Sequence, residues 1–172
     1  MSESSITSRL ENWDENKPLT REEAVEILNF PEEEMSKLLD CAYALRTKYK
    51  GKKVSVQLLT NVRSGNCSQN CAYCAQSRDS EAPIEKYRRV SDEKLYGDND
   101  LVDEKHLARH GIGLSGIGFS DEEIEDLADR IREMKKKETQ ICCSIGFLTE
   151  KQAKMLKEAG LDRINHNLNS SR

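Results

Sequence analysis

Three cysteines lie close together in the sequence and form the pattern C-x3-C-x2-C. They are Cys67, Cys71 and Cys74, and Tyr73 directly precedes the last of them. Three thiolates on one short loop can hold a 4Fe–4S cluster and leave its fourth iron open. The open iron can chelate the amino and carboxylate groups of S-adenosylmethionine, and an electron from the cluster can then break a C–S bond of the sulfonium. The spacing therefore predicts radical chemistry at an iron–sulfur cluster.

Other chemistry is compatible with part of this pattern. Cys71 and Cys74 form a C-x2-C pair, which is half of a common zinc site, but the adjacent Cys142 and Cys143 make a poor second pair. A thioredoxin-like redox pair is a further alternative, although it leaves Cys67 without a role. Burial of all three by chance fits a loop this polar least well.

The composition argues against a nucleic-acid-binding protein. The chain has 172 residues, of which 36% are hydrophobic and 34% charged, and its net charge is −4. A negative net charge disfavours binding through phosphate contacts. The length allows one domain with a core, but the hydrophobic share is low. The core is therefore thin, or part of the apolar surface meets another molecule.

The sequence also predicts a cytoplasmic protein without a membrane partner. Residues 1–16 contain no basic start followed by an apolar run, and no stretch approaches the ~18 apolar residues of a membrane span. Thiols stay reduced in the cytoplasm, so the six cysteines indicate metal binding, catalysis or burial.

Strands and helices are predicted to alternate after a helical preface, while residues 1–16 are expected to be loose. The preface comprises a helix capped by Thr20 and a second that starts at Pro31 and ends at Gly51. The predicted strands are 54–59, 112–114, 140–145 and 162–167, and the helices between them are 91–108, interrupted at 97–100, and two that start at capping boxes at Ser120 and Thr149.

This order predicts an α/β fold with a parallel sheet and right-handed crossovers. We expect a partial (β/α) barrel of about four parallel strands, or a small open sheet, with an N-terminal helical extension. The extension is residues 1–52 and the half barrel is residues 53–172. A full barrel takes ~250 residues, so this chain can supply about half of one. The cysteines follow the first strand, at the end of the sheet where such folds place their chemistry.

Several segments resemble the biotin synthase family of radical S-adenosylmethionine enzymes. The segments are Ser64-Gly65-Asn66-Cys67, Cys71-Ala72-Tyr73-Cys74-Ala75-Gln76-Ser77, Ala82-Pro83-Ile84, Leu156–Arg163 and Asn165-His166-Asn167-Leu168. The resemblance runs from about Lys53 to the last residue and is looser before that. It implies the N-terminal half of such an enzyme.

The resemblance implies sulfur insertion into dethiobiotin with S-adenosylmethionine as cofactor. Cys67, Cys71 and Cys74 would hold the 4Fe–4S cluster, and Cys142 would match one ligand of a second, 2Fe–2S cluster that donates the sulfur. The implied partners are a dethiobiotin-like small molecule and an electron donor such as flavodoxin or ferredoxin. A homodimer or a missing C-terminal half could cover the edge of the fourth strand.

Three further residues are implied to bind the cofactor. Tyr73 would lie beside the adenine, and Asn167 would match a residue that bridges cofactor and substrate. Asn169 stands where the family commonly has an aspartate facing the cofactor ribose. A second departure is Gly111, which replaces a ligand of the second cluster. The remaining ligands of that cluster would lie beyond Arg172, which makes a 2Fe–2S cluster and sulfur insertion by this chain doubtful.

Alternative functions therefore stay open. One is a related radical enzyme with another substrate and no sulfur donor, which Gly111 favours. Another is a truncated, non-catalytic iron–sulfur protein or redox sensor, and a third is a zinc-binding interaction protein.

The other motifs have structural interpretations as well as functional ones. Residues 111–116 match the dinucleotide fingerprint G-x-G-x-x-G, but they do not clearly follow a strand and open a helix, so we interpret them as a strand end or loop. His166 could line the site or be a core group. The remaining expectations are that His106 and His110 are on the surface, Cys41 is in a core, Cys142 and Cys143 face opposite sides of the sheet, and Gln76 and Ser77 either touch the cofactor or belong to a polar loop.

Overall fold

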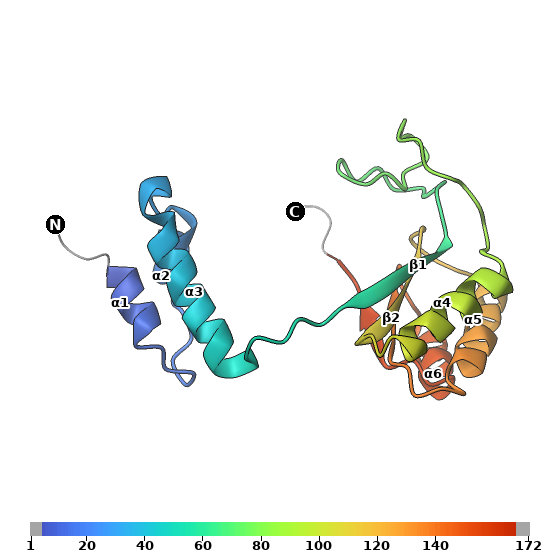
Figure 1. Cartoon of the computed structure of the whole chain (residues 1–172). Coiled ribbons are helices and arrows are strands. Elements are labelled where there is room, and N and C mark those ends of the chain that lie inside the picture. Colours follow the sequence, from blue (N-terminus) through green and yellow to red (C-terminus); the bar gives the residue numbers. More distant parts are fainter. Residues whose placement is uncertain (1–4, 168–172) are drawn as a thin grey trace. The chain divides into compact units, whose positions relative to one another are not determined.

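A computed structural model describes residues 5–167 of the chain (Figure 1). The contacts divide the chain into two compact units, Met1–Val54 and Ser55–Arg172. The division lies two residues after the one predicted from the sequence. Among the described residues, no helix is both long enough and apolar enough to cross a membrane.

The first unit is a small cluster of helices. Its elements are α1 (Ser5–Glu11), α2 (Arg21–Leu28), the 3₁₀ helix η1 (Glu32–Glu34) and α3 (Met35–Lys50). The prediction that residues 1–16 are loose is wrong for α1, because Ile6 and Leu10 pack with Phe30 and Cys41 in a buried core. This core confirms the expectation for Cys41. Pro31 precedes η1 and does not open an α-helix directly.

The second unit is a parallel sheet covered by helices on one face. The strands are β1 (Gln57–Arg63), β2 (Arg109–Leu114), β3 (Ile141–Ser144) and β4 (Arg163–Asn165), and the helices are α4 (Asp92–Glu104), α5 (Asp121–Met134) and α6 (Glu150–Glu158). The strands lie in the order β1-β2-β3-β4 and every pair is parallel. Figure 1 shows α4, α5 and α6 on the same side of the sheet. This sequential order confirms the α/β prediction and is the order of a barrel, since a doubly wound sheet reverses it.

The core of this unit lies between the sheet and the three helices. Its buried residues include Leu95, Ile112, Ile124, Leu127, Ile131, Ile141, Cys143 and Leu156. They alternate with residues of the opposite face along each strand, as the pleat of a strand requires. The opposite face is therefore free to form a site.

Local capping signals predicted where three helices begin. In each helix, the N-cap side chain accepts a hydrogen bond from the backbone three residues later, and the side chain at that position bonds back to the N-cap nitrogen. The pairs are Thr20 with Glu23, Ser120 with Glu123, and Thr149 with Gln152.

The first strand lies three residues further along the chain than predicted. Val54 and Val56 are 78% and 56% exposed, whereas Val62 is 4% exposed. The pairing explains the shift, because the register with β2 begins at Gln57 opposite Arg109. Pairing and burial, rather than the β-branched residues at 54 and 56, decide where this strand lies.

Helix α4 is continuous, although residues 97–100 were predicted to interrupt it. Ser91 caps the helix, and its polar residues find partners. Asn99 donates from Nδ2 to the Met134 carbonyl at 3.2 Å. Asp98 accepts from Lys94 at 2.6 Å. These contacts, one within α4 and one with α5, satisfy side chains that would favour a turn if they were isolated.

Gly97 has the lowest helix propensity of the residues in α4. It lies mid-helix and is exposed, and a Cβ added there would meet no atom within 4 Å. We expect Gly97→Ala to stabilise the unit by about 0.5–1 kcal/mol, because alanine loses less backbone entropy in a helix. Urea unfolding followed by circular dichroism would measure this. A lower unfolding midpoint for the variant would contradict the expectation.

His110 is buried, so the prediction that it lies on the surface is wrong. It is 0% exposed, because its position on β2 faces the helices. Its Nδ1 lies 3.2 Å from Asn99 Oδ1, and its Nε2 lies 2.8 Å from Thr60 Oγ1. Burial lowers the pKa of His110, an effect that the Asp98 carboxylate partly offsets.

Burial of His110 makes the stability of this unit depend on pH. Its pKa is about 6.5 in an unfolded chain and lower in the folded one. Between these two values the unfolded chain binds more protons, so stability is full above about pH 6.5 and is lost as the pH falls toward the lowered value. We expect a lower urea midpoint at pH 5.5 than at pH 7.5, and a smaller difference in His110→Gln. An equal difference in urea midpoint between the two pH values in the wild-type chain and in His110→Gln would contradict this.

Candidate cluster and cofactor site

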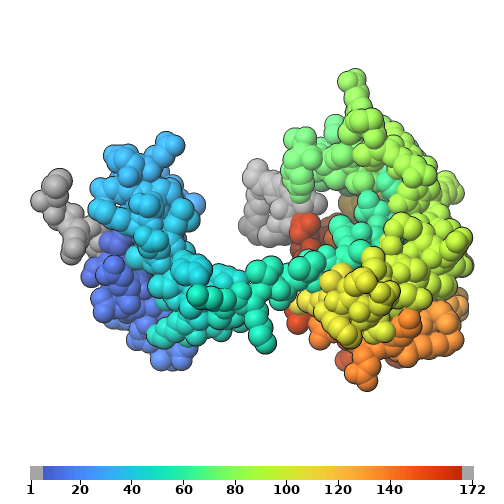
Figure 2. Space-filling view, viewed as in Figure 1, coloured from blue at the N-terminus to red at the C-terminus, as the bar shows by residue number. Residues whose placement is uncertain are grey.

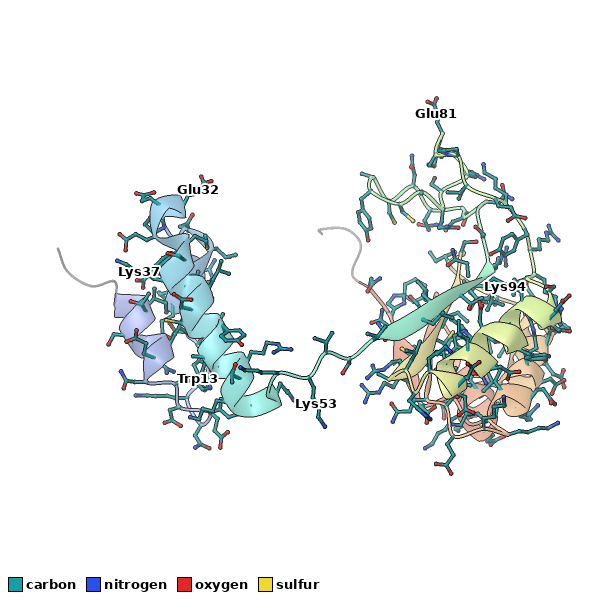
Figure 3. All side chains as sticks on the ribbon, viewed as in Figure 1. Trp13, Glu32, Lys37, Lys53, Glu81 and Lys94 are labelled. Carbon is teal, nitrogen blue, oxygen red and sulfur yellow. The ribbon has the colours of Figure 1, made fainter. Side chains whose placement is uncertain are left out.

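The loop between β1 and α4 carries the three cysteines and is fastened to β1 at both ends. Ser64 and Tyr87 exchange two backbone hydrogen bonds of 2.9 and 3.0 Å, and the Tyr87 hydroxyl donates to the Asn61 carbonyl at 2.8 Å. Figure 2 shows the loop, in green, projecting from the second unit, with Glu81 at its tip in Figure 3. The loop is therefore long but held at its base.

The chain turns sharply just before the first cysteine. Gly65 and Asn66 both have left-handed backbone angles, with φ of 74° and 52°. A Cβ on Gly65 would lie 2.6 Å from Lys86 Cγ, so only glycine fits without movement of that side chain. Ser115, after β2, donates to the Gly65 carbonyl at 2.7 Å. The turn is thus fixed from a neighbouring strand.

All three cysteines line one cavity of about 430 Å³ at the carboxyl ends of the strands. Cys74 N donates to the Cys71 carbonyl at 2.9 Å, which closes a turn between these two residues. The rest of the lining comes from the ends of the strands and the segments that follow them, and includes Asn61, Arg63, Gly113, Ser115, Ile117, Ser144, Gly146, Phe147, His166 and Asn167.

Arg63 brings positive charge to the rim of this cavity. Its guanidinium pairs with Glu123 at 3.1 Å and lies 5.4 Å from the centre of the Phe119 ring. These two contacts hold it at the carboxyl end of β1. A fixed cation there attracts anionic ligands to the cavity, although the Glu123 carboxylate offsets part of its charge.

The cofactor residues implied by the resemblance fall in different places. Asn167 lines the cavity, and so does His166, whose Nδ1 lies 3.1 Å from the Ile145 carbonyl. Tyr73 is 72% exposed and is not among the lining residues. Asn169 lies outside the described residues. The roles of Tyr73, Asn167 and Asn169 in binding a cofactor stay predictions.

The sequence comparisons decide the family. A sequence profile described as the Radical SAM superfamily matches residues 61–172. The chain belongs to the radical SAM superfamily. It is 41% identical over 155 residues to the biotin synthase of Geobacillus kaustophilus (strain HTA426), covering 90% of this chain and 46% of that protein. It is also 41% identical over 154 residues to the biotin synthase of Bacillus subtilis (strain 168), covering 89% and 46%. The chain therefore spans about half the length of these curated relatives.

Solved structures support the partial barrel. Methylornithine synthase (PylB) matches with a TM-score of 0.74 and 17% identity over 94% of this chain and 47% of its own. HydG, a maturase of the [FeFe]-hydrogenase, matches with a TM-score of 0.67 and 21% identity over 91% and 34%. At these identities the likeness shows the fold alone.

The donor set of the cavity contains three unpaired thiols. Within residues 5–167, no three or more His, Cys, Asp or Glu side chains are grouped closely enough to hold one ion. A zinc ion needs ligands ~2.0–2.3 Å from one point. A cubane binds each thiolate at a different iron, so its ligands stand further apart. Three unpaired cysteines that line one cavity can supply such thiolates, and their binding of a cluster stays a prediction.

Cys142 and Cys143 face opposite sides of the sheet, as predicted. Cys143 is 0% exposed in the core, and burial raises its pKa to about 12, so it stays a protonated thiol. Cys142 is half-buried on the other face, in register with Gly111 on β2. Neither Cys142 nor Gly111 lines the cavity.

The described strands supply one thiol toward a second, 2Fe–2S cluster, and the expectation that this chain lacks that cluster stays a prediction. Such a cluster takes four ligands, and on this face the strands offer the thiol of Cys142 alone beside a glycine that cannot bind iron. The segment 111–116 also lacks the strand–turn–helix arrangement in which this fingerprint binds a dinucleotide. Gly111 and Gly113 lie inside β2, and the next helix starts only at Asp121.

Sequence reasoning did not identify several of the residues that line the cavity. Gly146 is the clearest, since a Cβ there would lie 2.4 Å from the Ile117 carbonyl oxygen. Phe147 N also donates to that oxygen at 2.7 Å. Position at the end of a predicted strand was the available signal for Asn61, Ser144 and Gly146.

Proposed function

We propose that Cys67, Cys71 and Cys74 bind a 4Fe–4S cluster and that the cavity beside them binds S-adenosylmethionine. The observation that carries this proposal is that all three cysteines line one cavity at the carboxyl ends of parallel strands. When bound, the cluster supplies the electron that cleaves the sulfonium and releases a 5′-deoxyadenosyl radical. The protein itself positions the cofactor and the substrate and excludes water from the site.

The side chains around the cavity would share the binding of the cofactor. Asn61, Ser144 and Asn167 offer hydrogen-bonding groups to its amino acid and ribose parts. Phe147, which is 66% exposed, gives an apolar surface suited to an adenine. Tyr73 would reach the adenine from the cysteine loop, and Asn169 the ribose. In this proposal Asn167 also contacts the substrate.

For the substrate, we propose the biotin synthase type of reaction, which is sulfur insertion into dethiobiotin. The 41% identity to curated biotin synthases supports it. A specific observation favours a second candidate, a related radical SAM reaction on another small molecule without a sulfur donor. Gly111 lies beside Cys142 where a second cluster would need another thiolate. A chain without turnover, which only carries the cluster, is the third outcome.

The proposed partners follow from the chemistry and from the sheet. The cluster needs a cytoplasmic one-electron donor such as flavodoxin or ferredoxin. The edge strand β4 has Ile164 47% exposed on the side of the sheet that carries the helices. A second copy of the chain, or a C-terminal half, would cover this edge.

Anaerobic reconstitution with iron and sulfide tests the proposal. We expect about four irons per chain and an EPR signal of the reduced protein that changes when S-adenosylmethionine is added. Cleavage of the cofactor under dithionite would separate an enzyme from a binder, and an assay with dethiobiotin would separate the two candidate reactions. No iron uptake, or one zinc per chain, would refute the cluster.

A further inference from the structure

The side-chain amide of Gln76 bridges the two ends of the cysteine segment. Its Oε1 accepts hydrogen bonds from Gly65 N at 2.5 Å and from Ser64 Oγ at 3.2 Å. A backbone N–H can only donate, so the oxygen of the amide must be the atom that faces Gly65. The orientation of this amide is therefore determined by its partners.

The backbone of the same residue holds the first cysteine. Cys67 N donates to the Gln76 carbonyl at 3.0 Å, and Arg78 N donates to the Cys67 carbonyl at 3.0 Å. The side chain of Gln76 thus fixes the turn before Cys67, while its main chain fixes Cys67 itself.

The amide nitrogen of Gln76 has hydrogen-bond donors that are not used within the described chain. Gln76 lines the same cavity as the three cysteines. Its Nε2 carries two N–H groups, and in the part of the chain that the structure describes no protein acceptor takes them. Hydrogen bonds to the sulfurs of an iron–sulfur cluster are one of the features that set its reduction potential.

We propose that Gln76 is a positioning residue for Cys67 and that its Nε2 donates to a sulfur of the cluster. The second part rests on the proposed function. The acceptor oxygen holds the loop in its ligating form. The donors stabilise the reduced cluster, because its sulfurs carry more negative charge, and this raises the reduction potential.

Two substitutions separate these roles. Gln76→Glu keeps an oxygen for Gly65 N and removes the N–H donors, whereas Gln76→Ala removes both. In the chain without a cluster, we expect hydrogen exchange at the Gly65 amide to be about 3- to 10-fold faster in Gln76→Ala and close to normal in Gln76→Glu. In the reconstituted chain, Gln76→Glu should keep its iron and show a lower midpoint potential.

Gln69→Glu is the matched control for the added charge. Gln69 lines the same cavity, but no hydrogen bond of the described chain orients its amide, whereas Gly65 and Ser64 orient the amide of Gln76. Its substitution therefore adds the same charge without removing an oriented donor. Equal potential shifts in Gln69→Glu and Gln76→Glu would overturn the donor role. Unchanged Gly65 exchange in Gln76→Ala would overturn the positioning role. If the wild-type chain took up no cluster, the proposed function and the donor role would fail, while the exchange experiment would still decide the positioning role.

Discussion

Replacing Cys71 by alanine is expected to abolish cluster binding by the reconstituted chain. Iron should fall from about four per chain to below about one, and the EPR signal should disappear. The reason is that the two remaining thiolates, Cys67 and Cys74, leave two irons of the cubane without a cysteine ligand. The fold should stay intact, because the bond from Cys74 N to residue 71 uses the backbone carbonyl. Iron analysis, EPR and circular dichroism measure these three properties.

Cys142→Ala is the control for this prediction. Cys142 belongs to the same unit and is also an unpaired, half-buried cysteine, but it does not line the cavity. We expect it to bind as much iron as the wild-type chain. Full iron content in Cys71→Ala, or a parallel loss in Cys142→Ala, would show that the cluster is held elsewhere.

Gly146→Ala is expected to destabilise the second unit by about 2–3 kcal/mol. The added Cβ would lie 2.4 Å from the Ile117 oxygen and 2.8 Å from the Gly116 oxygen, both of which are backbone atoms. The segment after β2 must then move away, and the bond from Phe147 N to Ile117 is strained or lost. Since Ile117 and Phe147 both line the cavity, the reconstituted variant should also bind S-adenosylmethionine more weakly.

Gly118→Ala tests the same segment without the clash. A Cβ on Gly118 would meet no atom within 4 Å, so we expect a change of less than about 0.5 kcal/mol. Urea unfolding of both variants, followed by circular dichroism, makes the comparison. If the two variants unfold at the same concentration, the close approach at Gly146 does not constrain the structure.

Features that depend on neighbouring residues could be predicted well. The capping boxes at Thr20, Ser120 and Thr149 each involve two side chains three residues apart, so the sequence alone locates the helix starts. The alternation of strands and helices along the chain indicated the parallel sheet, because consecutive parallel strands need a crossover connection between them. The opposite orientation of Cys142 and Cys143 follows from the pleat of one strand.

Features that depend on distant residues were predicted badly. The start of β1 depends on its pairing with β2, more than 50 residues away, and not on Val54 or Val56. His110 is buried because α4 covers its side of the sheet, where Asn99 supplies a partner for the ring. The N-terminal segment forms α1 because Ile6 and Leu10 pack against Phe30 and Cys41. No local sequence pattern predicts this packing.

The same distinction holds for the site. The spacing of Cys67, Cys71 and Cys74 by itself determined which residues are candidates for a cluster, because the ligands of one loop are local in sequence. Only the tertiary structure decided what surrounds them, since the cavity collects Asn61, Ser144 and Asn167 from three different strand ends. Residues so far apart come together only after the strands have paired in register. The amide of Gln76 and the close approach at Gly146 belong to this second class, because both depend on contacts across turns that the sheet holds in place.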